Sequence, residues 1–284
     1  PDFEADAVAG RKPTLEFYSN MTYFVPGTLS FKGFKTIAVT TSAGVMKSEL
    51  SYIGLTSGMI GSLMQPVVID THGIGNPWLN YSYYLTPSFS FATFALLIML
   101  FTAYSITEEI KSGTSVQWLA TANDRISVAL AGKLIPQSVV LIAVMLCAVA
   151  IMFRFLHFPM NGSLAMFSVA VVLFVLASQS FAVLICSALP NPRLAFSVIS
   201  LLTVLTFSFA GFSFPVEDMY GAIAIFSYMM PVRYLFLIYV NTALNGFDTY
   251  FVRYYYVVLL AFIPVGYLLI GRLKKACLNP VYVP

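Results

Sequence analysis

Five stretches of this chain are long enough to cross a membrane and contain no Asp, Glu, Lys or Arg. A spanning helix needs about 20 mostly apolar residues to cross roughly 30 Å of hydrocarbon. The third stretch belongs to a longer uncharged run, which a turn signal at residues 157–162 divides. The windows are residues 85–107, 134–153, 163–189, 194–216 and 254–271. The sequence therefore predicts five membrane-spanning helices.

The composition favours the same class of protein. Hydrophobic residues make up 59% of the 284 residues and charged residues only 10%, whereas a soluble domain carries about 25% charged residues. The net charge is +3 and no long basic run occurs, so nucleic acid is not an expected partner. We expect an all-α integral membrane protein whose surroundings are membrane lipid.

Residue types that carry chemistry are few and scattered. The three cysteines, Cys147, Cys186 and Cys277, lie far apart without a CxxC pair, so no metal site is expected. Both histidines fall in loops without an evident partner, which leaves no nucleophile with its base. The GxxxxGK[ST] phosphate-binding loop is also absent from the sequence. We therefore expect no enzyme activity and no cofactor, and any ATP that drives the protein must be bound by a separate partner subunit.

Lys and Arg are unevenly distributed among the short loops, and this bias predicts the orientation of the chain. Lys111, Arg125 and Lys133 flank the first connection, and three basic residues follow the last window. With these ends in the cytoplasm, alternation through five spans places residues 1–84 outside the cell and the tail, residues 276–284, inside. The protein is then a multi-pass protein of the cytoplasmic (inner) membrane with a cytoplasmic C-terminus.

Residues 1–84 form a small extracytoplasmic domain in this topology. An amphipathic stripe predicts a helix over residues 39–64, and a short strand is expected over residues 65–70. No apolar segment in this domain could carry it across a membrane, so we expect a further span before residue 1.

Two shorter apolar runs lie between the fourth and fifth windows. Residues 219–232 and 234–245 are each too short to span, and they meet at Pro231 and Arg233. This pattern predicts a re-entrant helical hairpin over residues 217–247, whose backbone must be covered by protein. Arg233 is expected to reach water near the membrane surface, and an ion pair with Glu217 or Asp218 is expected at this interface.

Polar residues inside the predicted spans favour helix packing over substrate chemistry. No charged side chain lies deep in any window, which disfavours proton-coupled transport. Near the end of the fourth window four phenylalanines alternate with other residues, and they serve either packing or an apolar gate to a central pathway. They are Phe207, Phe209, Phe212 and Phe214.

The polar segment at residues 105–125 interrupts the apolar windows, so it must lie in water at one membrane face. With the sequences around it, this segment resembles the permease subunit of ABC-2 type transporters. The similar motifs are NPWLNYSYYLTP at residues 76–87, EEIKSGT at 108–114, GKLIP at 132–136, FAGFSFPVEDM at 209–219 and MPVRY at 230–234. The resemblance runs in collinear order from about residue 20 to residue 275.

The resemblance implies a type V exporter-like transmembrane domain over residues 85–275. It implies that residues 105–125 form a coupling helix that docks on an ABC ATPase subunit; the alternative is a solvated loop whose charges only fix the topology. Gly113 then permits a sharp turn, Thr114 caps the new helix, and Gln117 and Trp118 are presented to the partner. Glu108 and Glu109 are the hydrophilic anchors at the water interface.

The family also implies the working unit and the function. Two ATPase subunits and a second permease subunit, either a copy of this chain or a different one, complete the transporter. The expected function is ATP-driven export of a hydrophobic or amphipathic substrate. The alternative is a membrane sensor or scaffold that derives from a permease and does not transport, because a fold does not guarantee its usual function.

Overall fold

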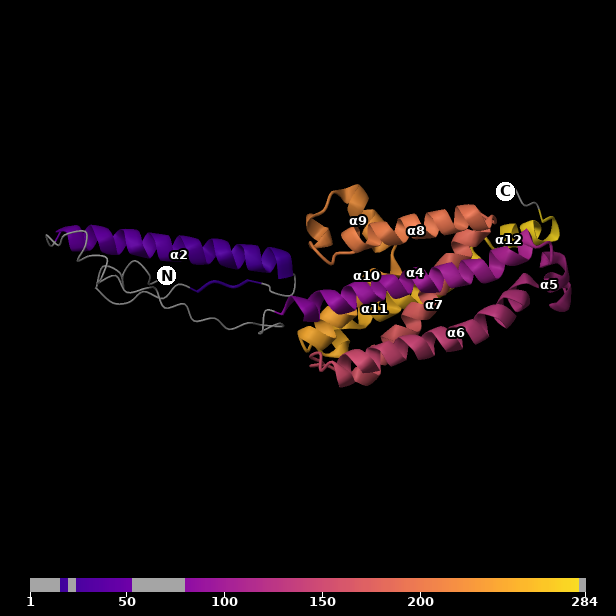
Figure 1. The fold of residues 1–284 in the computed structure, drawn as a ribbon, viewed down its shortest axis with the longest axis horizontal. Coiled ribbons are helices and arrows are strands. Elements are labelled where there is room, and N and C mark those ends of the chain that lie inside the picture. Colours follow the sequence, from indigo (N-terminus) through magenta and orange to yellow (C-terminus); the bar gives the residue numbers. More distant parts are fainter. Residues whose placement is uncertain (1–15, 20–23, 53–79, 281–284) are drawn as a thin grey trace. The chain divides into compact units, whose positions relative to one another are not determined.

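The computed structural model describes residues 16–19, 24–52 and 80–280, and all regular elements within these ranges are helices (Figure 1). The chain divides into two compact units, residues 1–79 and residues 80–284.

The described part of the first unit consists of one long helix and a short extended segment. Helix α2 (Phe24–Tyr52) is lined by residues 16–19, where the ring of Phe17 stacks on that of Phe34 at a centroid distance of 4.3 Å. The helix begins well before residue 39, where the amphipathic stripe predicted its start. The remainder of that predicted helix, residues 53–64, and the predicted strand at residues 65–70 lie outside the described residues.

The second unit contains five helices that are long and apolar enough to cross a membrane, as the sequence predicts. They are α4 (Tyr81–Lys111), α6 (Ile126–Ala150) with its π-helical extension η1 (Ile151–Phe155), α7 (Leu164–Ala188), α8 (Pro192–Phe209), and α11 (Thr249–Phe262) with η4 (Ile263–Tyr267) and α12 (Ile270–Leu278). The shorter elements are α5 (Ser115–Thr121), η2 (Val216–Asp218), α9 (Gly221–Tyr228), α10 (Pro231–Ile238) and η3 (Tyr239–Leu244).

Helix α7 lies at the centre of this bundle. In its most apolar window 72% of the residues are buried, against 17% for α6 and 28% for α8. Phe167 of α7 is fully buried and contacts the rings of Phe91, Phe153 and Tyr239 from three other elements. Such aromatic contacts add to the burial of apolar area, so they fix the other helices around α7.

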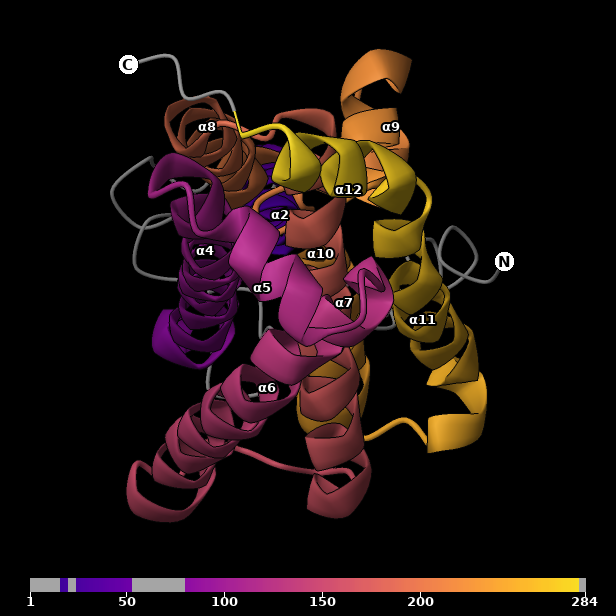
Figure 2. The same ribbon diagram turned by 90° about the vertical axis from the view of Figure 1, so that its right-hand side faces the viewer.

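The bundle has two distinct ends, which we name by their short helices (Figure 1). The α9 end holds the start of α4, the loop between η1 and α7, the segment at residues 210–248 and the start of α11. The α5 end holds α5, α12 and the junction of α7 with α8. In Figure 2, which views the bundle from the α5 end, α5 and α12 lie across it.

The main differences from the predicted windows occur in three of the spans, and each has a local cause. Helix α6 begins at Ile126 instead of residue 134. Lys133 was excluded from the predicted window because it is charged, but it forms an ion pair with Glu109 and lies within the helix. Helix α8 ends at Phe209 instead of residue 216, because Gly211 adopts a left-handed φ of +94°. The last window is broken at η4, where Pro264 cannot donate a backbone hydrogen bond.

Ser180 of α7 stabilises this break in the last span. Its hydroxyl donates to the carbonyl of Ile263 at 2.6 Å and accepts from the backbone N–H of Gly266 at 2.8 Å. One side chain thus binds two backbone groups at the point where the last span changes from α-helix to 3₁₀ geometry. The break allows α12 to turn across the α5 end of the bundle (Figure 2).

The segment predicted as a hairpin bends by 81° between α9 and α10. Both of its ends lie at the α9 end of the bundle. Before the segment, the backbone carbonyl of Phe212 accepts a 2.6 Å hydrogen bond from Tyr84 at the start of α4. After it, the carbonyls of Ala243 and Leu244 accept hydrogen bonds from Asn161, in the loop between η1 and α7. The chain therefore leaves and returns at the same end of the bundle, and the re-entrant hairpin stays a prediction.

Candidate coupling site

The predicted coupling segment folds into the end of α4, the separate helix α5 and a tight turn. Gly113 has a φ of +72°, so the expected change of direction occurs at a residue that adopts this conformation without a Cβ penalty. Asn123 and Asp124 have φ values of +50° and +56° and turn the chain again before α6. Left-handed residues on both sides thus separate α5 from the two long helices that it connects.

Glu109 and Lys133 join the end of α4 to the start of α6. The Lys133 ammonium lies 2.6 Å from Glu109 Oε1 and donates to the carbonyl of Ser105 at 2.7 Å. The two charged side chains are only 26% and 23% exposed, so water screens the pair less than it would a pair on the surface. This charge-assisted contact holds together α4 and α6, the two helices that α5 connects.

Trp118 of α5 is tied to the same ion pair. The Lys133 ammonium lies 4.8 Å from the centre of its ring, within the range of a cation–π interaction. The indole is partly exposed, while its neighbour Gln117 is exposed. One face of the predicted aromatic anchor is therefore covered by the protein itself, and the rest is available for contact.

Thr114 stands at the N-cap position of α5, but its side chain makes no capping hydrogen bond there. The prediction that Thr114 caps this helix through its side chain is wrong. Its hydroxyl instead contacts the carboxylate of Glu109. The backbone of Thr114 is in the helical region, with a ψ of −3°, whereas a capping residue usually has extended backbone.

The C-terminal helix α12 holds α5 from a second side. The Ser115 hydroxyl donates to the backbone carbonyl of Cys277 at 2.8 Å, and both residues are fully buried. Leu119 of α5 and Leu273 of α12 are fully buried as well. The opposite face of α5 remains open, since Val116 is 44% exposed and Gln117 and Ala120 are also exposed.

A second ion pair of the segment lies at its surface. Lys111 and Glu108 are 3.5 Å apart with 46% and 34% of their side chains exposed. The Ser112 hydroxyl also donates to Glu108 at 3.2 Å. Exposed pairs of this kind contribute little to stability, so the two neighbouring glutamates differ in their roles: Glu109 is a structural anchor and Glu108 is a solvated surface group.

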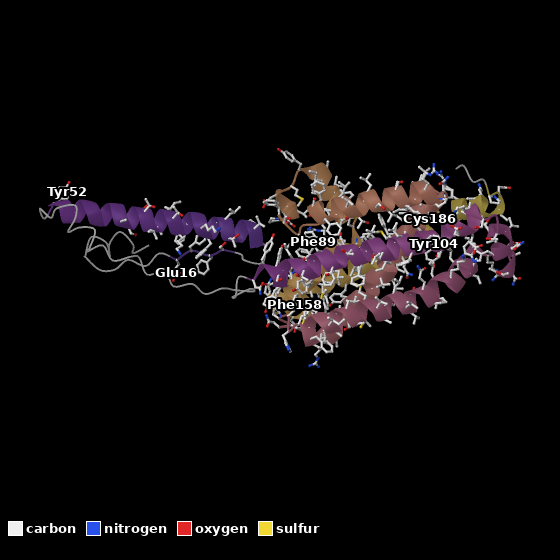
Figure 3. The ribbon with its side chains drawn as sticks, in the orientation of Figure 1. Glu16, Tyr52, Phe89, Tyr104, Phe158 and Cys186 are labelled. Atoms are coloured by element: carbon white, nitrogen blue, oxygen red, sulfur yellow. The ribbon has the colours of Figure 1, made fainter. Side chains whose placement is uncertain are left out.

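The phenylalanines near the end of α8 do not form one surface. Phe207 stacks on Phe89 of α4 at 5.3 Å, near the α9 end of the bundle (Figure 3). Phe212 is fully buried against Phe89 and Phe236, whereas Phe214 is 52% exposed and Phe209 is partly buried. Phe212 packs in the core, and a gating role for the group stays a prediction.

In the hairpin, the structure brings Glu217 and Arg233 together at 3.5 Å, while Asp218 is exposed. Pro231 is the first residue of α10, a position that needs no backbone N–H. Arg233 is 3% exposed, so the expectation that its side chain reaches water is wrong. Its guanidinium turns inward, toward the end of α8.

Sequence reasoning used Lys133 only as an orientation signal and missed its structural part in the site. The signal was present: once the helix extends back to Ile126, Lys133 becomes a charge inside a helix that must find a partner. No sequence pattern predicted the contact between Ser115 and Cys277, because it forms only when the break in the last span brings α12 back to α5.

In the part of the chain that the structure describes, five helices are apolar and long enough to span a membrane. Four of them pack around the fifth, the buried helix α7, and two short helices lie across one end; this arrangement defines a multi-pass membrane protein. The chain belongs to the ABC-2 family of transporter proteins, whose family model matches residues 1–272. It is similar to two curated proteins named probable multidrug ABC transporter permease YbhR, from Escherichia coli strain K12 and from Escherichia coli O157:H7. Each is 26% identical over 159 residues, which cover 56% of this chain and 43% of the relative. No solved structure was found to match the chain.

Proposed function

We propose that this chain is the permease subunit of an ATP-driven ABC transporter that exports a hydrophobic or amphipathic substrate across the cytoplasmic membrane. One observation carries the proposal: α5 is anchored on one side by the Glu109–Lys133 pair and on the other by α12, and it presents an open face. A short helix fixed in this way can pass a movement of a docked partner to the spanning helices. ATP is bound and hydrolysed on that partner.

The distant relatives and the exposed apolar surface support the proposal of an apolar cargo. The relatives' names describe multidrug permeases, and large apolar side chains are exposed along the spanning helices of this chain. Such faces contact lipid, a second permease subunit or cargo. We place the transport pathway between two permease subunits.

The loss of Trp118 tests the docking role of α5. We expect Trp118→Ala to weaken assembly with the ATP-binding subunit by at least about tenfold, because buried tryptophans are frequent hot spots of interfaces. The measurement is the affinity of the purified permease for that subunit, with ATP hydrolysis and transport assayed on the same sample. The matched control is Tyr220→Ala, which removes an aromatic side chain that is 87% exposed at the α9 end.

Unchanged assembly and transport in Trp118→Ala would reject the docking role. The sensor or scaffold alternative makes a different prediction, namely that an assembled complex leaves cargo on its original side of the membrane even while ATP is hydrolysed.

Basic residues support an orientation with the α5 end in the cytoplasm. This end of the bundle carries Lys111, Arg125, Lys133, Arg193, Arg272, Lys274 and Lys275, and positive charge concentrates on the cytoplasmic side of membrane proteins. In this orientation the α9 end faces outward, the segment at residues 217–247 is a re-entrant hairpin that opens outward, and residues 1–84 are extracytoplasmic.

Thiol labelling tests this topology. In a variant whose three native cysteines are replaced, we expect Asp218→Cys and Asp248→Cys to react with an impermeant reagent added outside intact cells. Lys275→Cys should react only after the membrane is opened. Reaction of only one of the first two positions would mean that the intervening segment spans the membrane, and it would overturn the hairpin.

A further inference from the structure

The guanidinium of Arg233 connects four segments of the chain. Its own helix is α10. Nη1 lies 3.4 Å from the backbone carbonyl oxygen of Ala210, just after α8, and 3.5 Å from Ser227 Oγ in α9. Nη2 lies 3.5 Å from Glu217 Oε1 in η2, and the guanidinium carbon lies 4.8 Å from the centre of the Tyr228 ring. One buried side chain thus joins the end of α8 to both helices of the hairpin.

The turn that follows α8 is built closely around this guanidinium. Gly211 adopts a φ of +94°, and a Cβ at that position would lie 2.8 Å from Arg233 Nη1. The same Cβ would lie 3.1 Å from the side chain of Val216, which is only 1% exposed. The path of the chain from α8 to η2 therefore depends on the position of Arg233.

The contacts of Arg233 are weaker than those at the other end of the hairpin. Its hydrogen-bond distances of 3.4–3.5 Å lie beyond the usual range for N–H···O bonds, and the Glu217 side chain is 64% exposed to solvent. Nε has no hydrogen-bond partner among the described residues. In contrast, Asn161 binds the carbonyls of Ala243 and Leu244 at 3.0 and 2.9 Å. The hairpin thus has one firm attachment and one that breaks more easily.

We propose that Arg233 is a positioning residue that acts as a releasable latch between the end of α8 and the α9–α10 hairpin, and that this latch opens when the transporter opens outward. This inference rests on the proposed function for its place in the transport cycle. The latch itself rests only on the contacts of Arg233. A buried charge held by a few long hydrogen bonds suits a contact that must both form and break. When the contact breaks, the guanidinium moves into water and is not left buried without partners.

The accessibility of position 216 measures the state of the latch. Val216→Cys, in a chain without its native cysteines, places a small thiol under the closed turn. We expect slow reaction with an impermeant maleimide in the complete complex without nucleotide. Adding Arg233→Gln or Glu217→Gln should accelerate labelling by about tenfold, because each removes one charge of the ion pair that holds the buried guanidinium and so promotes local opening. In the complex with intact Arg233, ATP and cargo should accelerate labelling as well.

Two further variants separate the latch from a general loss of structure. Arg253→Gln is the matched control, since Arg253 also stacks on a tyrosine, Tyr250, at 4.0 Å but is exposed, and labelling should not change. Arg233→Lys keeps the charge but lacks the planar fork that reaches several acceptors together, so labelling should be intermediate. Where Arg233→Gln fails to fold, Glu217→Gln alters an exposed carboxylate and keeps the experiment decisive.

Unchanged labelling in both Arg233→Gln and Glu217→Gln would overturn the latch. An absence of ATP-dependent labelling in a complex that does transport cargo would overturn its opening during the cycle. If the complex neither hydrolyses ATP nor transports, the proposed function fails, while the nucleotide-free comparison still decides whether Arg233 holds the turn.

Discussion

Lys133→Met is expected to abolish most transport while the protein still inserts into the membrane. The substitution leaves the partly buried Glu109 carboxylate without its 2.6 Å partner and frees the carbonyl of Ser105. It also removes the cation from the Trp118 ring. We expect a loss of about 2 kcal/mol at the junction of α4, α5 and α6, between the values typical of surface and of fully buried pairs. Transport per ATP hydrolysed should fall by about tenfold or more.

Lys111→Met is the matched control for this change. It removes the same charge at the same end of the bundle, but its partner Glu108 is 34% exposed and 3.5 Å away. We expect a change in stability below about 0.5 kcal/mol and normal coupling. A double variant, Lys133→Met with Glu109→Gln, should recover part of the lost stability because no unpaired charge remains. Equal effects of the two lysine variants would contradict the anchoring role of Lys133.

Gly266→Ala should destabilise the packing of the last span on α7. A Cβ at Gly266 would lie 2.6 Å from both the backbone oxygen and the hydroxyl oxygen of Ser180, and 3.1 Å from its Cα. These atoms belong largely to the backbone of the central helix and cannot move aside at low cost. We expect a loss of about 1–3 kcal/mol, as for other overpacked sites, seen as a lower midpoint of thermal unfolding in detergent.

Gly271→Ala is the control, because nothing lies within 4 Å of the Cβ it would add. This glycine is in α12, where alanine is favoured by up to about 1 kcal/mol on helix propensity. The two Gly→Ala changes should therefore have opposite signs. A neutral Gly266→Ala would show that Ser180 does not hold the break in the last span.

The spanning helices could be predicted from the sequence because each depends on a local property, the length of an uncharged apolar run. The windows at residues 85–107 and 163–189 correspond closely to α4 and α7. Helix boundaries could not be predicted where they depend on a contact with a residue far away in the sequence. Lys133 lies inside α6 only because Glu109 lies beside it, and a charge-free window cannot reveal that partner.

The candidate site was predictable in its position and less so in its contacts. The turn at Gly113 follows from its residue type, because glycine adopts a positive φ without strain. The Ser115–Cys277 contact joins residues that are far apart in the sequence, and it requires the break at η4. Because Arg233 lies near a predicted membrane interface, its side chain was expected to be exposed. In the structure the side chain is buried and contacts the carbonyl of Ala210 and the carboxylate of Glu217.

Site-specific photocrosslinking can show whether α5 is the surface on which the ATP-binding subunit docks. A photoreactive amino acid replaces Gln117 on the open face of α5 or, in a second sample, Tyr220 at the α9 end, in complexes shown to hydrolyse ATP. We predict an adduct with the ATP-binding subunit from position 117 and none from position 220. An adduct from position 220, or none from position 117, would mean that the ATP-binding subunit does not dock on α5.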